Sequence, residues 1–118
     1  MINIQKKAEA IDENYSTGWI PLTSGNNGIL AGSLSIIVDG ITGTKDADIN
    51  IYVTNDVEGL IPTIKVATDT IASDPYNLLV DIGTPYRFIK VELILNSITL
   101  IDTFELSGTF FAENGGGE

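Results

Sequence analysis

Hydrophobic and polar residues alternate along most of the chain after residue 16. Successive side chains of a β-strand point to opposite faces of its sheet, so apolar residues that share one parity lie on one buried face. The clearest sets are Leu34, Ile36 and Val38; Ile49, Ile51 and Val53; and Leu78, Val80 and Ile82. This pattern predicts half-buried strands rather than amphipathic helices.

Short groups of Gly, Asn, Asp and Pro separate the apolar segments, as expected for strands joined by turns. The predicted strands are Gly18–Leu22, Gly32–Val38, Ile49–Thr54, Thr63–Thr68, Tyr76–Ile82, Arg87–Leu95 and Thr103–Phe111. The predicted turns are Ser24–Gly28, Asp39–Gly40, Thr42–Asp46, Asn55–Gly59, Ser73–Pro75 and Gly83–Pro85. We therefore expect an all-β fold, a single antiparallel β-sandwich or jelly-roll-like domain, with little helix.

The segment Arg87–Leu95 shows both faces of one strand. Its odd positions, centred on Val91, are apolar and predict the inner face. Its even positions predict a half-covered outer face: Phe88, Lys90, Glu92 and Ile94. In the last strand Gly108 interrupts the alternation, which indicates either a bulge or a close backbone approach.

The first sixteen residues are polar and charged. Their sizeable apolar side chains are Ile2, Ile4, Ile11 and Tyr15. We expect either a short helix over Gln5–Glu13 or an extended arm that adds little to the core and anchors on a neighbouring subunit through those four residues. The chain then divides into an N-terminal arm (1–16), a sandwich domain (17–112) and a flexible Gly-rich tail (113–118).

Composition agrees with a β-fold and narrows the partners. The chain has 18 Ile, 6 Val and 12 Thr against 7 Ala, and β-branched residues favour strands. Sixteen acidic and six basic residues give a formal net charge of −10, which repels nucleic-acid phosphates and anionic lipids. We expect no direct nucleic-acid partner, no membrane binding, and no secretory signal peptide in the polar N-terminal segment.

Candidate catalytic chemistry is sparse. The sequence contains no His and no Cys, so the most common acid–base, nucleophilic and zinc-ligand groups are missing. Carboxylate pairs for acid–base work, Asp56 with Glu58 or Asp69 with Asp74, are expected in any chain this acidic. We expect a protein that is not an enzyme and needs no cofactor.

One motif resembles a metal site. Asp46, Asp48 and Asn50 have the spacing that opens an EF-hand calcium loop. The Gly and Glu that complete such a loop are replaced by Ile51 and Val57. The same spacing is typical of the outward face of a strand, which is the interpretation we favour, so no metal is expected and these three residues are weak calcium candidates.

Aromatic residues suggest a second class of ligand, because sugars stack on exposed rings. The candidates are Tyr15, Trp19, Tyr52, Tyr76 and Tyr86. The competing interpretation, which we favour for Trp19 and Tyr86, is that they are core or rim residues at the starts of strands.

The order of segments from Ile51 onward resembles small β-sandwich virion proteins of tailed bacteriophages. The matching segments are Ile51–Asp56 (IYVTND), Tyr86–Leu93 (YRFIKVEL), Asn96–Thr99 (NSIT) and Phe104–Phe111 (FELSGTFF). Those proteins carry an SND loop and a YRYIRV strand in the same order. Here Thr54 replaces the Ser, and Phe88 and Lys90 replace the Tyr and Arg, which keeps size and charge.

The resemblance implies a non-enzymatic structural component of a virion, either a capsid decoration protein or a head–tail, tail or fibre component. Its implied partners are other virion proteins and further copies of itself, after synthesis in the host cytoplasm. The alternative is a glycan-binding or adhesin-like module of a host-contacting fibre.

Overall fold

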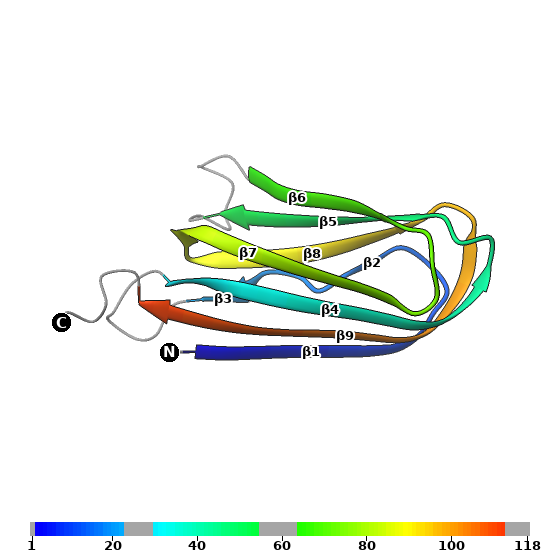
Figure 1. Cartoon of the computed structure of the whole chain (residues 1–118), viewed down its shortest axis with the longest axis horizontal. Helices are drawn as coiled ribbons and strands as arrows, with labels where there is room; N and C mark the ends of the chain where they lie inside the picture. The colour runs from blue at the N-terminus through cyan, green and yellow to red at the C-terminus, as the bar shows by residue number, and fades with distance from the viewer. Residues whose placement is uncertain (1, 23–29, 55–63, 113–118) are drawn as a thin grey trace.

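The computed structural model describes residues 2–22, 30–54 and 64–112, and their regular structure is entirely β. Two antiparallel sheets pack face to face into a flattened sandwich measuring 49 × 27 × 19 Å (Figure 1). The strands are β1 (Ile2–Ile11), β2 (Tyr15–Ser16), β3 (Ile20–Pro21), β4 (Leu30–Gly43), β5 (Ala47–Thr54), β6 (Ile64–Ile71), β7 (Tyr76–Tyr86), β8 (Phe88–Leu95) and β9 (Ile98–Ala112). The predicted all-β sandwich is confirmed.

The strand order is that of a jelly roll. Sheet A has the order β1-β9-β4-β7, and sheet B has the order β2-β8-β5-β6, with β3 also paired to β8. β2 and β3 follow one another along the same edge of β8, opposite Leu93 and Ile89 respectively. Counted as one strand, they complete a nested pairing of first with last, second with seventh, third with sixth and fourth with fifth, as in the eight-stranded jelly roll.

The core lies between the two sheets and includes most of the residues that parity predicts. Side chains that are less than 2% exposed include Leu34, Ile36, Ile49, Ile51, Ile89, Leu93, Ile101, Phe104 and Phe110. Burying an aliphatic or aromatic side chain of this size contributes about 1.5–3 kcal/mol. The sandwich is therefore held by the alternation of β-branched and aromatic residues along its strands.

β8 and β9 match the detailed expectations. Val91 is fully buried, and the four outer residues of β8 are half-buried. At Gly108 the pairing with Leu34 continues without a shift in register. A Cβ atom at Gly108 would lie 2.8 Å from the Phe110 ring and 2.9 Å from the Leu34 side chain. This glycine therefore marks a close approach and not a bulge.

The N-terminal segment corrects our expectation. Residues 2–11 form neither a helix nor an arm but the edge strand β1, which pairs with β9 along its length (Figure 1). Ile4 and Ile11 are 9% and 6% exposed and belong to the core. The expectation that this segment adds little to the core is wrong, because β9 provides it with a complete hydrogen-bonding edge.

Two predicted turns lie inside strands. Asp39–Gly40 is part of β4 and Gly83–Pro85 is part of β7. At Gly40 the chain bends instead of turning back, since Val38 and Ile41 both face the core. The predicted turns Ser24–Gly28 and Asn55–Gly59, and the tail 113–118, lie outside the described residues.

Candidate functional site

The five aromatic candidates have different environments. Tyr15 packs edge-on against Phe104, with ring centroids 5.4 Å apart. Tyr76 is buried and donates a hydrogen bond to Asp69 at 2.6 Å. The side chain of Tyr86 lies outside the described set. Only Trp19 and Tyr52, both half-buried, lie near the same residue on the outer face of sheet B.

That residue is Lys90. Together with Lys65 on the far side of Tyr52, these residues form what we call the aromatic–lysine row: Trp19, Lys90, Tyr52 and Lys65. Tyr52 of β5 lies opposite Lys90 of β8 on one side and Lys65 of β6 on the other. The Lys90 Nζ atom lies 4.6 Å from the centroid of the Trp19 ring and 5.4 Å from that of Tyr52. Lys65 Nζ lies 5.9 Å from the Tyr52 centroid. These distances are those of cation–π contacts.

The position of Trp19 follows from the interrupted edge of β8. Thr17 bonds to Val91 twice, through its backbone N–H to the Val91 carbonyl at 3.0 Å and by accepting the Val91 N–H on its hydroxyl at 3.1 Å. The chain rejoins β8 at Ile20, opposite Ile89. Trp19 is therefore held between two anchored residues and beside Lys90.

A second row of side chains lies next to the first on the same face, and we call it the polar row: Ser16, Glu92, Asn50 and Thr68. Thr68 donates its hydroxyl to Asn50 Oδ1 at 2.8 Å. Asn50 Nδ2 and Tyr52 Oη donate to Glu92 Oε1 at 3.5 and 3.3 Å. The Tyr52 hydroxyl thus connects the two rows.

Tyr52 stays protonated in this setting. Its partial burial, followed by the negative charge of Glu92 and the hydrogen bond to it, raises the pKa of Tyr52 above 10.0. The phenol is consequently a neutral hydrogen-bond donor at physiological pH. The two rows present two ammonium groups, one carboxylate and neutral polar groups, and Asp48 adds a second carboxylate on the same face of β5.

The weak calcium candidates are placed as the strand interpretation predicts. Asp48 and Asn50 lie on the outer face of β5, whereas the alternating Ala47, Ile49 and Ile51 are fully buried. Asn50 is occupied by the polar row, and Asp46 Oδ1 accepts the Asn96 side-chain N–H at 3.3 Å. Within residues 2–22, 30–54 and 64–112, no three His, Cys, Asp or Glu side chains are grouped to hold a metal ion.

Of the two carboxylate pairs considered for acid–base chemistry, the structure describes Asp69 and Asp74, and both accept hydrogen bonds from other groups. Asp69 accepts the Tyr76 hydroxyl, while Asp74 accepts two backbone N–H groups of β4. Asp69 and Asp74 therefore have separate partners. Asp56 and Glu58 lie outside the described residues.

The residues expected to form an assembly interface lie mostly inside the sandwich. Ile4 and Ile11 are buried in the core, and Tyr15 is half-buried against Phe104. The side chain of Ile2 is outside the described set. An interface built on these residues would require β1 to leave β9.

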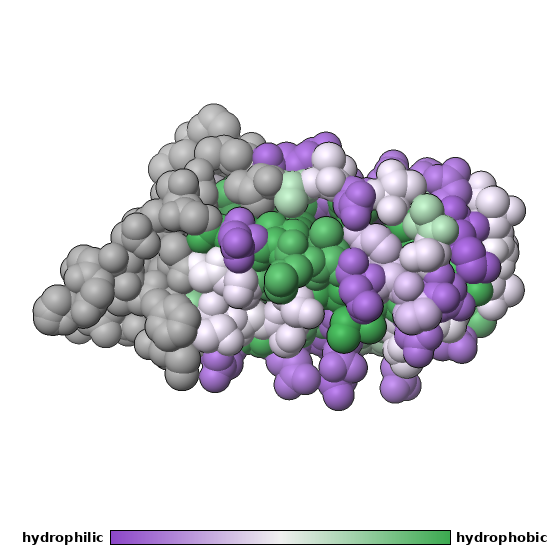
Figure 2. All heavy atoms as spheres, in the orientation of Figure 1, coloured by the Kyte–Doolittle hydropathy of each residue, from purple (hydrophilic) through white to green (hydrophobic). Residues whose placement is uncertain are grey.

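A different surface is exposed on the outer face of sheet A, and we call it the Leu79 face. Leu79 on β7 is 74% exposed and Ile37 on β4 is 43% exposed. Leu79 pairs with Ser35, and Ile37 pairs with Asn77, so the two apolar side chains are diagonal neighbours on adjacent strands. In Figure 2 hydrophobic atoms gather near the middle of this face, with pale atoms and purple, hydrophilic atoms beside them.

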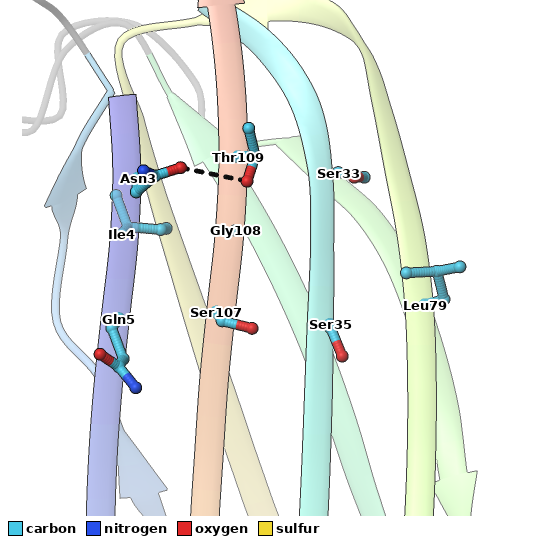
Figure 3. A pocket seen from close by; sticks show the side chains of 9 residues that line it. All are labelled: Asn3, Ile4, Gln5, Ser33, Ser35, Leu79, Ser107, Gly108 and Thr109. Atoms are coloured by element: carbon cyan, nitrogen blue, oxygen red, sulfur yellow. Dashed lines mark hydrogen bonds between the residues drawn. The ribbon is translucent and has the colours of Figure 1, made fainter. Parts of the chain in front are cut away.

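Small and uncharged residues lie beside Leu79 across the sheet, whereas the exposed Asp81 is the next outward-facing residue along β7. An open depression of about 480 Å³ lies between β1 and β7 (Figure 3). Its lining is Asn3, Ile4, Gln5, Ser33, Ser35, Leu79, Ser107, Gly108 and Thr109. Thr109 donates its hydroxyl to Asn3 Oδ1 at 3.1 Å, as Figure 3 shows. The lining carries no charged side chain.

The two surfaces differ in how far they can be predicted from the sequence. Trp19 and Tyr52 are recognisable as candidate aromatic residues. Their proximity to Lys90 cannot be predicted from the sequence, because it depends on the register of β5 against β8. The even positions of β8 do identify Lys90 and Glu92 as outward-facing residues. Leu79 is detectable from parity, because it lies between the inward-facing Leu78 and Val80.

Comparisons with known proteins add little. No protein-family model and no curated protein matches the chain. One similar solved structure is the mitogen derived from Yersinia pseudotuberculosis, with 11% identity over 92% of this chain and 83% of that chain, and a TM-score of 0.48. Another is a mutant of a family 29 carbohydrate binding module, with 12% identity over 92% of each chain and a TM-score of 0.42.

A third similar structure is the VP2 subviral particle of infectious bursal disease virus. It has 19% identity and a TM-score of 0.43, and the match covers 98% of this chain but only 34% of that one. No helix long and apolar enough to cross a membrane occurs in the part of the chain that the structure describes.

Proposed function

We propose that this protein is a non-enzymatic structural component of a bacteriophage virion that acts by docking the Leu79 face on another virion protein. The observation that carries the proposal is the exposure of Leu79, at 74%, next to Ile37 on an ordered sheet. Burying apolar side chains of this kind at an interface is favourable by about 25 cal/mol per Å² of apolar surface.

The arrangement of the Leu79 face fits protein docking. Interfaces concentrate apolar contact at the centre and charge at the rim. Here Ser35 pairs with Leu79, and Ser33 and Ser107 lie next to Ser35. The charged side chains are Asp81, two residues along β7 from Leu79, and Glu105 and Lys7, which share the cross-strand row of Ile37. Serine side chains lose little conformational entropy when they are covered. The serine-lined area beside Leu79 can therefore be buried without a charge, while Asp81 and Glu105 place negative charges at its border.

The proposal of a virion as the assembly is supported by the resemblance of the segments from Ile51 onward to virion proteins. A structural virion protein functions by occupying a place in an assembly. The net charge of −10 would keep free copies apart before assembly and would favour basic surfaces as partners. The partner is another virion protein, a second copy of this chain, or both.

The test is incorporation into particles. The full-length chain and the variants Leu79→Asp and Ile37→Asp are supplied during infection, and the chain that co-sediments with virions is quantified. The control is Thr70→Asp, which places the same charge at an exposed site on sheet B. The proposal is supported if Leu79→Asp and Ile37→Asp lose incorporation while Thr70→Asp retains it. Equal incorporation of all four proteins overturns it, and sedimentation velocity of the purified chain shows whether a second copy is the partner.

A second candidate function, glycan binding, is favoured by one observation. Trp19 and Tyr52 flank Lys90 on an outer sheet face that also carries hydrogen-bonding groups. Aromatic rings and polar side chains on one surface are the elements of sugar recognition, in which ring faces contact the sugar C–H groups and polar groups bind hydroxyls. A glycan array probed with the full-length chain and with Trp19→Ala tests this candidate independently of the Leu79 face.

A further inference from the structure

The aromatic–lysine row is a positive feature in a strongly acidic protein. Six basic residues are present against sixteen acidic ones, yet two of the six lie in this row. Among the described residues, the contacts of the Lys65 and Lys90 ammonium groups are with aromatic rings and not with carboxylates. An ammonium group held by ring faces keeps its N–H donors for an anion.

We propose that the outer face of sheet B binds an acidic saccharide, in which a sugar carboxylate contacts Lys90 and Lys65 and the sugar hydroxyls contact the polar row. This inference rests on the second candidate function, glycan binding, and adds the chemical class of the ligand. It is independent of docking through the Leu79 face, which lies on the other sheet.

The two rows fit the two ends of such a sugar. Lys90 and Lys65 lie on either side of Tyr52 in one cross-strand row, so their charges act on the same region of the surface. The hydrogen bonds that Glu92 receives from other described residues are long, at 3.3 and 3.5 Å. A carboxylate has about four acceptor positions, so Glu92 retains capacity to accept sugar hydroxyls.

The net charge of the whole chain limits the charge density of the ligand that this face can bind. A net charge of −10 opposes dense polyanions such as nucleic acid and opposes an anionic membrane. A saccharide with one carboxylate per sugar ring has a lower charge density and presents C–H faces to Trp19 and Tyr52. An acidic saccharide therefore matches the local positive charge without meeting the full repulsion of the protein.

The test is isothermal titration calorimetry of the full-length chain with an oligomer of galacturonic acid and with the neutral galactose oligomer of the same length and linkage. We expect the acidic oligomer to bind at least tenfold more tightly, with an affinity that falls as salt is raised. Lys90→Gln and Lys65→Gln should each weaken binding of the acidic oligomer at least fivefold and reduce the preference for it over the neutral oligomer. The control is Lys7→Gln, an exposed lysine on β1 of sheet A.

The outcomes separate this inference from glycan binding in general. Equal binding of the two oligomers overturns the acidic preference but supports a glycan site. Binding of neither oligomer, together with an empty glycan array, overturns both. Acidic binding that is unchanged in Lys90→Gln and Lys65→Gln, or is lost equally in Lys7→Gln, also overturns the proposal, because it places the anion elsewhere. Circular dichroism of each variant confirms that the fold is retained.

Discussion

The carboxylate of Asp74 accepts the backbone N–H of Ile41 at 3.1 Å, and its other oxygen accepts the N–H of Gly40 at the same distance. The reason lies in the lengths of the strands. β7 begins at Tyr76, opposite Val38, so β4 continues past the point where β7 can pair with it. Asp74, just before β7, supplies the acceptors that a strand would otherwise provide.

Replacing Asp74 should therefore destabilise the sandwich at this bend. Leaving a partly buried N–H without its acceptor costs about 1–3 kcal/mol, so Asp74→Ala should lower the free energy of unfolding by about this amount. Urea denaturation followed by tryptophan fluorescence measures it. Asp12→Ala, at an exposed acidic residue, is the control. Equal stability of the two variants would show that water replaces Asp74 at no cost.

Introducing an aspartate should affect stability strongly on the inner face of a sheet and only weakly on the outer face. Val91→Asp puts a carboxylate at a fully buried position of β8 and should cost several kcal/mol, because no partner for a charge lies in that apolar core. Leu79→Asp puts the same group on a side chain that is 74% exposed and should change stability by less than about 0.5 kcal/mol. Thermal melting of both variants checks the assignment of inner and outer faces, which fails if Val91→Asp melts like the wild type.

Parity along single strands was sufficient for much of the core. Alternation is a local property, so the sequence around Val91 separates the inner from the outer face without knowledge of any partner strand. The aromatic–lysine row is different, because Trp19, Tyr52 and Lys90 come from three strands or their ends. Their proximity depends on the pairing registers of sheet B, which single-strand periodicity does not contain.

The misassigned N-terminal segment shows how a bend hides a strand. Ile4 and Ile11 both face the core but have opposite parity, so no period-2 pattern connects them. The break occurs at Ala10, whose φ of 52° reverses the alternation within β1. The bend of β4 at Gly40, with φ 73°, interrupts the alternation in the same way, and the Asp39–Gly40 sequence predicts a turn where the strand in fact continues.

The Tyr76–Asp69 pair predicts a loss of stability in alkali. Burial, followed by the hydrogen bond to Asp69 and its charge, raises the pKa of Tyr76 above 10.0 in the folded state. The unfolded chain then releases the phenolic proton at lower pH than the folded chain does. Stability from this group is complete below pH 10 and falls as pH rises above 10.

The measurement compares the wild type with Tyr76→Phe by urea denaturation between pH 8 and pH 11. The variant should be less stable at pH 8, because it lacks the hydrogen bond to Asp69, and its stability should fall less steeply above pH 10. All other ionisable groups are common to both proteins, so the difference between the two curves isolates Tyr76. Parallel curves would contradict the shift.

The last prediction concerns β1. Ile11 is 6% exposed, and removing a buried isoleucine side chain to Ala costs about 2–5 kcal/mol. Ile11→Ala should therefore lower the melting temperature by several degrees, whereas Lys7→Ala, exposed on the same strand, should change it little. Deleting residues 1–14 should have a larger effect than either, because it also exposes the long edge of β9 to solvent and to other chains. A truncated protein that melts within a few degrees of the full chain and stays monomeric would show that β1 is a detachable arm, the role first expected for this segment.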